Sequence, residues 1–288
     1  MKLATFLKTP VIVLIFFTSL FTFSQNDFQG KAYYMSKTSV DMNGFGGRQM
    51  SEERKKQIAE RMKSMFEKTY ILTFNKTESI YKEEERLETP GQGGGFRGMM
   101  GSFTGGNQYK NIKNNQLLQE QEFFGKQFLI KDLLPKLNWV MGSETKQIGK
   151  YMCFKATAIK PASGFDFSSF RRPSRDKAQD STKTKAEEKV EVPKETEIVA
   201  WYTLQIPINQ GPGEYWGLPG LILEVNAGRT TILCSKIVMN PEEKGTIKVP
   251  SKGKEVTQKE YDEIITKKMK EMRENFRGRR PGGNHPRG

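Results

Sequence analysis

Short runs in which hydrophobic and polar residues alternate recur along most of the chain, and this two-residue period is typical of β-strands. Turn sequences predict hairpins at Lys76-Thr77 and at 226–229, and Gly125 separates two further runs. Strands are predicted at 28–40, 69–75, 78–82, 116–124, 126–130, 151–158, 198–206, 221–225 and 230–238.

Two stretches carry hydrophobic residues at helical spacing. The first covers 51–67, and the second begins with a capping box between Thr257 and Glu260 and continues to 276. Their apolar sides consist of Ile58, Met62, Met65 and Phe66, and of Tyr261, Ile265, Met269, Met272 and Phe276. We therefore expect a mainly β protein, an antiparallel sheet or half-barrel with two amphipathic helices, with an α+β fold as the alternative.

The N-terminus has the features of a cleavable export signal. Lys2 and Lys8 precede an apolar run at 11–23, and the small Ser24 before polar Gln25 predicts cleavage between them. That run is shorter than the roughly 20 residues that a spanning helix needs. We expect a signal peptide at 1–24, no later transmembrane segment, and an exported protein that is periplasmic or secreted.

The remaining sequence reads as one β-rich domain at 25–250, a C-terminal helix at 251–276 and a basic, disordered tail at 277–288. Gly-rich sequence near 89–108 and charged sequence near 160–195 predict long disordered insertions in the domain. The net charge of +14 favours anionic partners, and the tail could contact an anionic surface. A solvated tail also explains its arginines, so we expect no specific nucleic-acid binding.

Residues 217–222 read Gly-Leu-Pro-Gly-Leu-Ile, and their surroundings include Trp201, Trp216 and, further back, Trp139. In these features, between about residues 28 and 238, the chain resembles the GLPGLI family of exported Bacteroidetes proteins. The resemblance implies an envelope location and a similar architecture, and it implies no established activity.

The signature segment has two physical interpretations. Gly217 and Gly220 allow backbone conformations that other residues avoid, and Pro219 fixes one torsion between them. A structural turn is one interpretation. The other is a turn that contacts a ligand or partner, with Trp216, Gly217, Leu218, Pro219 and Gly220 as the contact residues.

Catalytic chemistry finds little support in the sequence. His285, the single histidine, lies near the end of the predicted tail, which disfavours a Ser-His-Asp triad, a Cys-His pair and most zinc sites. A carboxylate-dependent hydrolase stays a weaker alternative, although a solvated charge run explains adjacent acids such as Glu83 and Glu84. We expect no catalytic residues and no cofactor.

Sulfur chemistry leaves two further possibilities. Met62, Met65, Met99 and Met100 are candidate thioether ligands of Cu(I), although methionine on a helix also fills hydrophobic cores. Cys153 and Cys234 could form one disulfide in an oxidising compartment or remain separate buried thiols.

These observations together predict an exported, non-enzymatic envelope protein that binds a partner or ligand through a β scaffold. The suspected partner is another envelope or outer-membrane protein. A methionine-based copper-binding protein is the main alternative.

Overall fold

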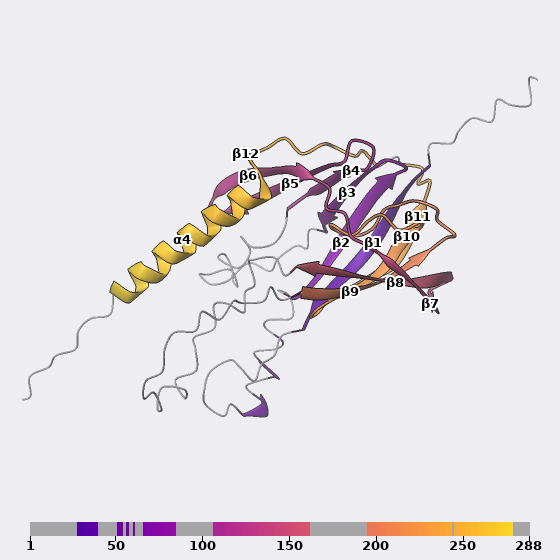
Figure 1. The fold of residues 1–288 in the computed structure, drawn as a ribbon, viewed down its shortest axis with the longest axis horizontal. Helices are drawn as coiled ribbons and strands as arrows, with labels where there is room; N and C mark the ends of the chain where they lie inside the picture. The colour runs from indigo at the N-terminus through magenta and orange to yellow at the C-terminus, as the bar shows by residue number, and fades with distance from the viewer. Residues whose placement is uncertain are drawn as a thin grey trace, which may run out of the picture.

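The structure of the chain is a computed structural model that describes residues 28–39, 51–53, 56–57, 60, 66–84, 106–161, 195–243 and 245–278. The elements whose bounds lie within these described residues are twelve strands and the helix α4 (Figure 1). The strands are β1 (Gln29–Thr38), β2 (Glu67–Asn75), β3 (Glu78–Glu83), β4 (Gln108–Asn111), β5 (Gln116–Phe123), β6 (Lys126–Leu133), β7 (Val140–Ile148), β8 (Tyr151–Pro161), β9 (Glu195–Thr203), β10 (Leu221–Ala227), β11 (Thr230–Met239) and β12 (Lys254–Val256). Helix α4 covers Gln258–Gly278.

All twelve strands belong to one open sheet with the order β12-β6-β5-β4-β3-β2-β1-β11-β10-β9-β8-β7. Neighbouring strands are antiparallel except β12, which pairs with β6 in parallel. The predicted fold class, mainly β with an antiparallel sheet, is confirmed. The predicted hairpins β2–β3 and β10–β11 are also confirmed by their strand pairing, and the predicted strands on either side of Gly125 pair as β5 and β6.

Strands that lie far apart in the sheet order share one hydrophobic core. Tyr34 on β1 and Phe74 on β2 belong to the same buried cluster as Cys153 on β8 and Leu223 on β10. Tyr81 on β3 belongs to the same cluster, and six steps of sheet order separate β3 from β8, so the sheet must curve strongly to bring these residues together. In Figure 1, β8 and β9 cross in front of β1 and β2 in accordance with this curvature.

At the opposite end of the sheet, α4 packs beside β6. Tyr261 and Ile265 of the helix are buried against Phe128 and Ile130 of the strand. The predicted capping box is present, because the Thr257 backbone N–H donates to the Glu260 carboxylate (2.7 Å) and the Glu260 N–H donates to the Thr257 hydroxyl (3.2 Å). This helix therefore begins at its predicted cap. The predicted start at 251 is wrong, because the residues before the cap form β12 at Lys254–Val256 and α4 begins only at Gln258.

Several sequence predictions lie wholly or mainly outside the described residues. They are the signal peptide, the insertions near 89–108 and 160–195, and the tail at 277–288. Of the predicted helix 51–67, the structure describes 51–53, 56–57, 60, 66 and 67; positions 52, 53, 56, 57, 60 and 66 are helical, whereas Glu67 already begins β2. None of the helices in the described ranges is long and apolar enough to cross a membrane.

Candidate functional site

The segment 204–220, which connects β9 to β10 and contains most of the signature, packs into the curved sheet. Ile206 and Ile208 are buried in the main core cluster, and Leu218 is buried in the neighbouring one. The backbone N–H of Leu221 donates to the Ile206 carbonyl (2.9 Å), and that of Ile222 donates to the Gln210 carbonyl (3.1 Å). The segment is therefore held by hydrogen bonds and by hydrophobic burial.

A buried lysine on β4 fixes the middle of this segment. The Lys110 amine donates to the carbonyls of Gly211 (2.7 Å) and Tyr215 (3.3 Å), and its side chain is fully buried. Burial lowers the pKa of Lys110 to about 7, because a charged amine loses its hydration; the negative charge of Glu214 partly offsets this effect. Lys110 thus places a titratable group beneath the segment.

The two tryptophans beside the signature use their indole donors inside the protein. Trp216 Nε1 donates to the Pro135 carbonyl (2.7 Å), and Trp139 Nε1 donates to the Trp216 carbonyl (2.9 Å). These reciprocal bonds join the 134–139 connection to the 204–220 segment. They give Trp216 a structural role that needs no ligand.

The two glycines of the signature disfavour a side chain for different steric reasons. Gly217 has φ of +93°, a conformation that L side chains rarely adopt. A Cβ on Gly220 would lie 2.1 Å from the carbonyl oxygen of Thr203, far inside van der Waals contact. Gly217 and Pro219 are exposed, whereas Leu218 and Gly220 are buried. These contacts support the structural-turn interpretation, and ligand contact at 216–220 stays a prediction.

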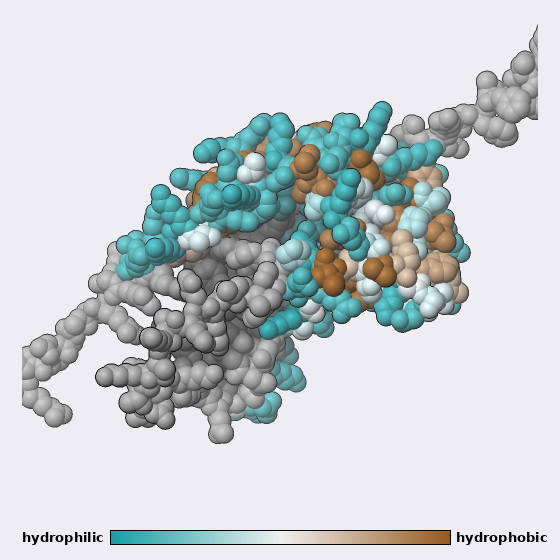
Figure 2. Space-filling model, viewed as in Figure 1, coloured by the Kyte–Doolittle hydropathy of each residue, from teal (hydrophilic) through white to brown (hydrophobic). Residues whose placement is uncertain are grey.

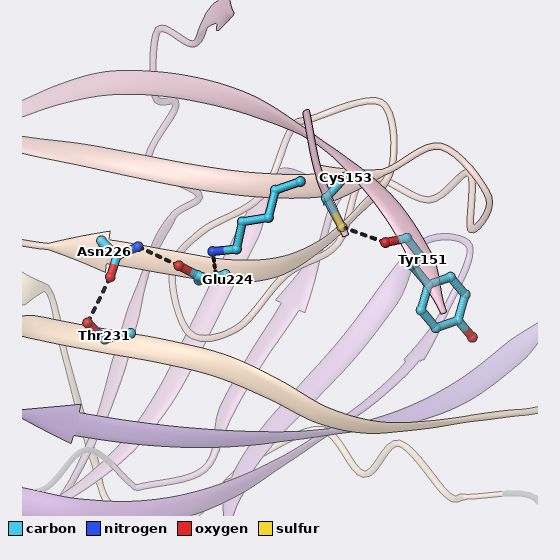
Figure 3. A network of polar contacts seen from close by, with 6 residues as sticks. Tyr151, Cys153, Glu224, Asn226 and Thr231 are labelled. Carbon is cyan, nitrogen blue, oxygen red and sulfur yellow. Dashed lines mark hydrogen bonds and ion pairs between the residues drawn. The ribbon is translucent and has the colours of Figure 1, made fainter. Parts of the chain in front are cut away.

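A polar network that the sequence did not predict joins the edge strand to the middle of the sheet (Figure 3). The Lys146 amine on β7 contacts the Glu224 carboxylate on β10 at 2.5 Å. The other Glu224 oxygen accepts from Asn226 (2.8 Å), whose amide oxygen accepts from Thr231 (2.7 Å). The Lys146 amine also lies 5.0 Å from the centre of the Trp201 ring.

Both oxygens of the nearly buried Glu224 accept a hydrogen bond inside the protein, one from Lys146 and the other from Asn226. Lys146 reaches past β8 and β9 to do this. The arrangement is suited to holding β7 in place.

Both cysteines are free, buried thiols in the same core cluster. Burial raises the pKa of Cys153 to about 11 and that of Cys234 to about 12, because a thiolate would lose its hydration. These pKa values describe thiols that are poor nucleophiles at neutral pH. Whether the two cysteines pair in the exported protein stays a prediction.

The methionines Met62, Met65, Met99 and Met100 lie outside the described residues, as does His285. The copper-binding alternative therefore stays untested. Within the parts of the chain that the structure describes, no group of three or more His, Cys, Asp and Glu side chains could hold a metal ion.

Exposed hydrophobic side chains concentrate at the β7–β8 end of the sheet. In the described residues, four of the ten exposed large hydrophobic side chains belong to these two strands: Val140 (67% exposed), Met141 (52%), Met152 (48%) and Ile159 (63%). Figure 2 shows hydrophobic side chains over the region of β7, β8 and β9, with hydrophilic side chains around them. This surface, which we call the β7–β8 edge, is the candidate binding site.

Comparisons with known proteins match the region of the edge and the signature. A family model described as a protein of unknown function, Porph_ging, matches residues 139–224, which begin beside β7 and end within β10. No curated protein is significantly similar in sequence.

Two solved structures of PNGF-II, in space groups C2 and P21, match at 15% identity with TM-scores of 0.44 and 0.43. The match covers 83% of this chain and 33% of the PNGF-II chain, so this chain spans about a third of the PNGF-II length.

Proposed function

We propose that this chain is an exported cell-envelope protein of the GLPGLI type that binds a partner protein through its β-sheet and catalyses no reaction. The charged start, apolar run and small residue at 24 support export. The signature at 217–222 and its tryptophan context support the family, and the Porph_ging match at 139–224 includes the whole of that signature.

The observation that carries the proposal is the exposed hydrophobic surface at the β7–β8 edge. Exposed hydrophobic surface raises the free energy of the isolated protein in water, and its burial by a partner drives association. Val140, Met141, Met152 and Ile159 lie on strands, which hold their backbones in place. A partner therefore loses little binding free energy to ordering this surface.

The signature segment has a supporting role in this proposal. It fills the curved sheet through Ile206, Ile208 and Leu218. Hydrogen bonds made by Trp216 and Trp139 join it to the 134–139 connection, which leads directly into β7. The signature thus supports the scaffold and sets the position at which the edge strand begins.

The test is recovery of a partner from the native envelope. Cells producing the tagged protein are treated with a short crosslinker, and the recovered proteins are identified by mass spectrometry. We expect one envelope protein to be recovered reproducibly, and the double variant Met152→Lys, Ile159→Lys to reduce its recovery at least tenfold.

Met35→Lys is the matched control, because Met35 is 54% exposed but lies on the central strand β1. We expect it to recover the partner as the unaltered protein does. Equal recovery by the β8 double variant, or no reproducible partner for any form, would contradict the proposal.

Export has its own test. The mass of the mature protein from the envelope is expected to correspond to a chain that begins at Gln25. A cytoplasmic protein that retains residues 1–24 would contradict export and leave the binding surface to be tested separately.

A further inference from the structure

We infer that the partner binds by adding an extended strand to the free edge of β7, and this inference rests on the proposed function. β7 is the last strand of the sheet and, among the described strands, pairs with β8 alone. The outer edge of such a strand presents backbone N–H and C=O groups in the spacing that another strand satisfies.

The exposed side chains of β7 indicate that the partner segment bound at this edge is a strand. Val140 and Met141 pair with Thr157 and Ala156 in regular register, so their side chains point to opposite faces of the sheet. Both are more than half exposed. A partner that docks on one face covers one of them, whereas an added strand has side chains on both faces and contacts both.

The exposed hydrophobic residues of the neighbouring strand β8 also lie on both faces of the sheet. Ile159 lies on the Val140 face of β8, and Met152 lies on the Met141 face, as their spacing from Thr157 and Ala156 requires. Ile159 lies near Val140, whereas Met152 pairs with Gln147 beyond the register shift, so hydrophobic side chains border the two faces of the edge at its two ends. We expect the incoming segment to carry hydrophobic residues at successive positions opposite Val140 and Met141.

The two edge strands of the sheet, β12 and β7, differ in length and in exposure. At the other end β12 has only three residues, and α4 packs beside the adjoining β6. β7 has nine residues, of which Val140 to Thr145 are all exposed. The ion pair between Lys146 on β7 and Glu224 on β10 does not cover the outer edge of β7.

β7 also contains a bulge that limits its pairing with arbitrary strands. Between Met141 and Thr145 the register shifts, so that 142–144 lie opposite Lys155 as a bulge. Bulges on edge strands disfavour pairing with an arbitrary flat strand. The regular positions Val140 and Met141 therefore make the primary contact, and a matching partner segment must end or bend beyond them.

The experiment places a photoreactive amino acid at position 140 or at position 141 of the full chain, in its own cell envelope. Crosslinked residues are then mapped by mass spectrometry. Strand addition predicts that both positions label the same partner, within a few residues of each other in one segment. The matched control is the same group at position 133, since Leu133 is 69% exposed but lies at the end of β6; we expect it to leave that segment unlabelled.

The alternatives are distinguishable. If short-crosslinker recovery yields a partner but positions 140 and 141 label separate segments, only one of them labels, or neither does, strand addition is overturned and partner binding stands. Equal labelling of the same segment from position 133 also overturns strand addition. If neither method yields a reproducible partner, the proposed function fails and the inference fails with it.

Discussion

At the scale of single residues, the signature contains one position that tolerates no side chain. Ala in place of Gly220 would bring Cβ to 2.1 Å from the Thr203 carbonyl oxygen, which belongs to backbone and cannot rotate away. We expect Gly220→Ala to lower the free energy of unfolding by about 3 kcal/mol, the upper part of the usual range for overpacking. Urea denaturation measures this change.

Gly142→Ala is the control for that substitution. At Gly142 the nearest atom would lie 3.4 Å from the new Cβ, an ordinary contact, and the residue is exposed. We expect a change within about 0.5 kcal/mol. Equal effects of the two substitutions would show that Gly220 is not under the steric constraint that the structure describes.

Lys110 makes stability depend on pH. Its pKa is lowered from 10.5 to about 7 by burial, so above pH 7 the unfolded chain binds more protons than the folded one at this site. Stability should therefore rise between pH 7 and 8.5, before the cysteines of the unfolded chain ionise. The contribution is at most about 1.4 kcal/mol per pH unit.

The measurement is urea denaturation at pH 7.0, 7.5, 8.0 and 8.5 for the unaltered protein and for Lys110→Met. The slope of the free energy of unfolding against pH should be more positive for the unaltered protein. Parallel curves would mean that Lys110 keeps an ordinary pKa when folded.

The two thiols should resist alkylation in the folded protein. With the pKa of Cys153 near 11 and that of Cys234 near 12, almost no thiolate is present at pH 8. We expect iodoacetamide to label neither native thiol within an hour, and both after unfolding without reductant. Rapid native labelling would contradict their burial, and no labelling after unfolding would show that they pair.

At the scale of elements, β7 depends on a contact with β10. Glu224 is only 9% exposed while Lys146 is partly exposed, so loss of the carboxylate leaves a half-solvated amine and an unpaired Asn226 amide. We expect Glu224→Ala to cost about 2 kcal/mol, less than for a fully buried pair. Hydrogen exchange of β7 should also become faster.

The comparison for this prediction is Glu144→Ala, which breaks the more exposed pair between Glu144 and Lys155. We expect it to cost about 0.5 kcal/mol and to leave the exchange of β7 largely unchanged. A Glu224 variant no worse than this one would contradict the role of the Lys146–Glu224 contact in holding the edge.

Elements with a strong local pattern could be predicted from the sequence, and those without one could not. Alternating or compact hydrophobic runs mark the strands β2, β3, β8 and β10. The capping residues Thr257 and Glu260 mark the start of α4. The strands β4, β7 and β12 were not predicted. β7 is almost wholly exposed, β12 has three residues, and inward-pointing Lys110 breaks the polarity expected of β4.

At the scale of the whole molecule, the sheet order depends on pairings that local patterns do not encode. β1 lies between β2 and β11, and its pairing with β11 joins Gly30 to Met239. The sequence located the signature but not its burial, which depends on Lys110 and Trp139 from distant segments. Lys146 and Glu224 were missed for the same reason: 78 positions separate them.

The central claim is that the protein acts through the β7–β8 edge while the signature segment supports the scaffold. The most direct measurement is hydrogen exchange by mass spectrometry, comparing the purified protein with the protein in native envelope fractions. We predict added protection in the envelope at 140–161 and none beyond the purified level at 204–220. Added protection at 204–220 with an unchanged β7–β8 edge would contradict the claim and make the signature itself the contact site.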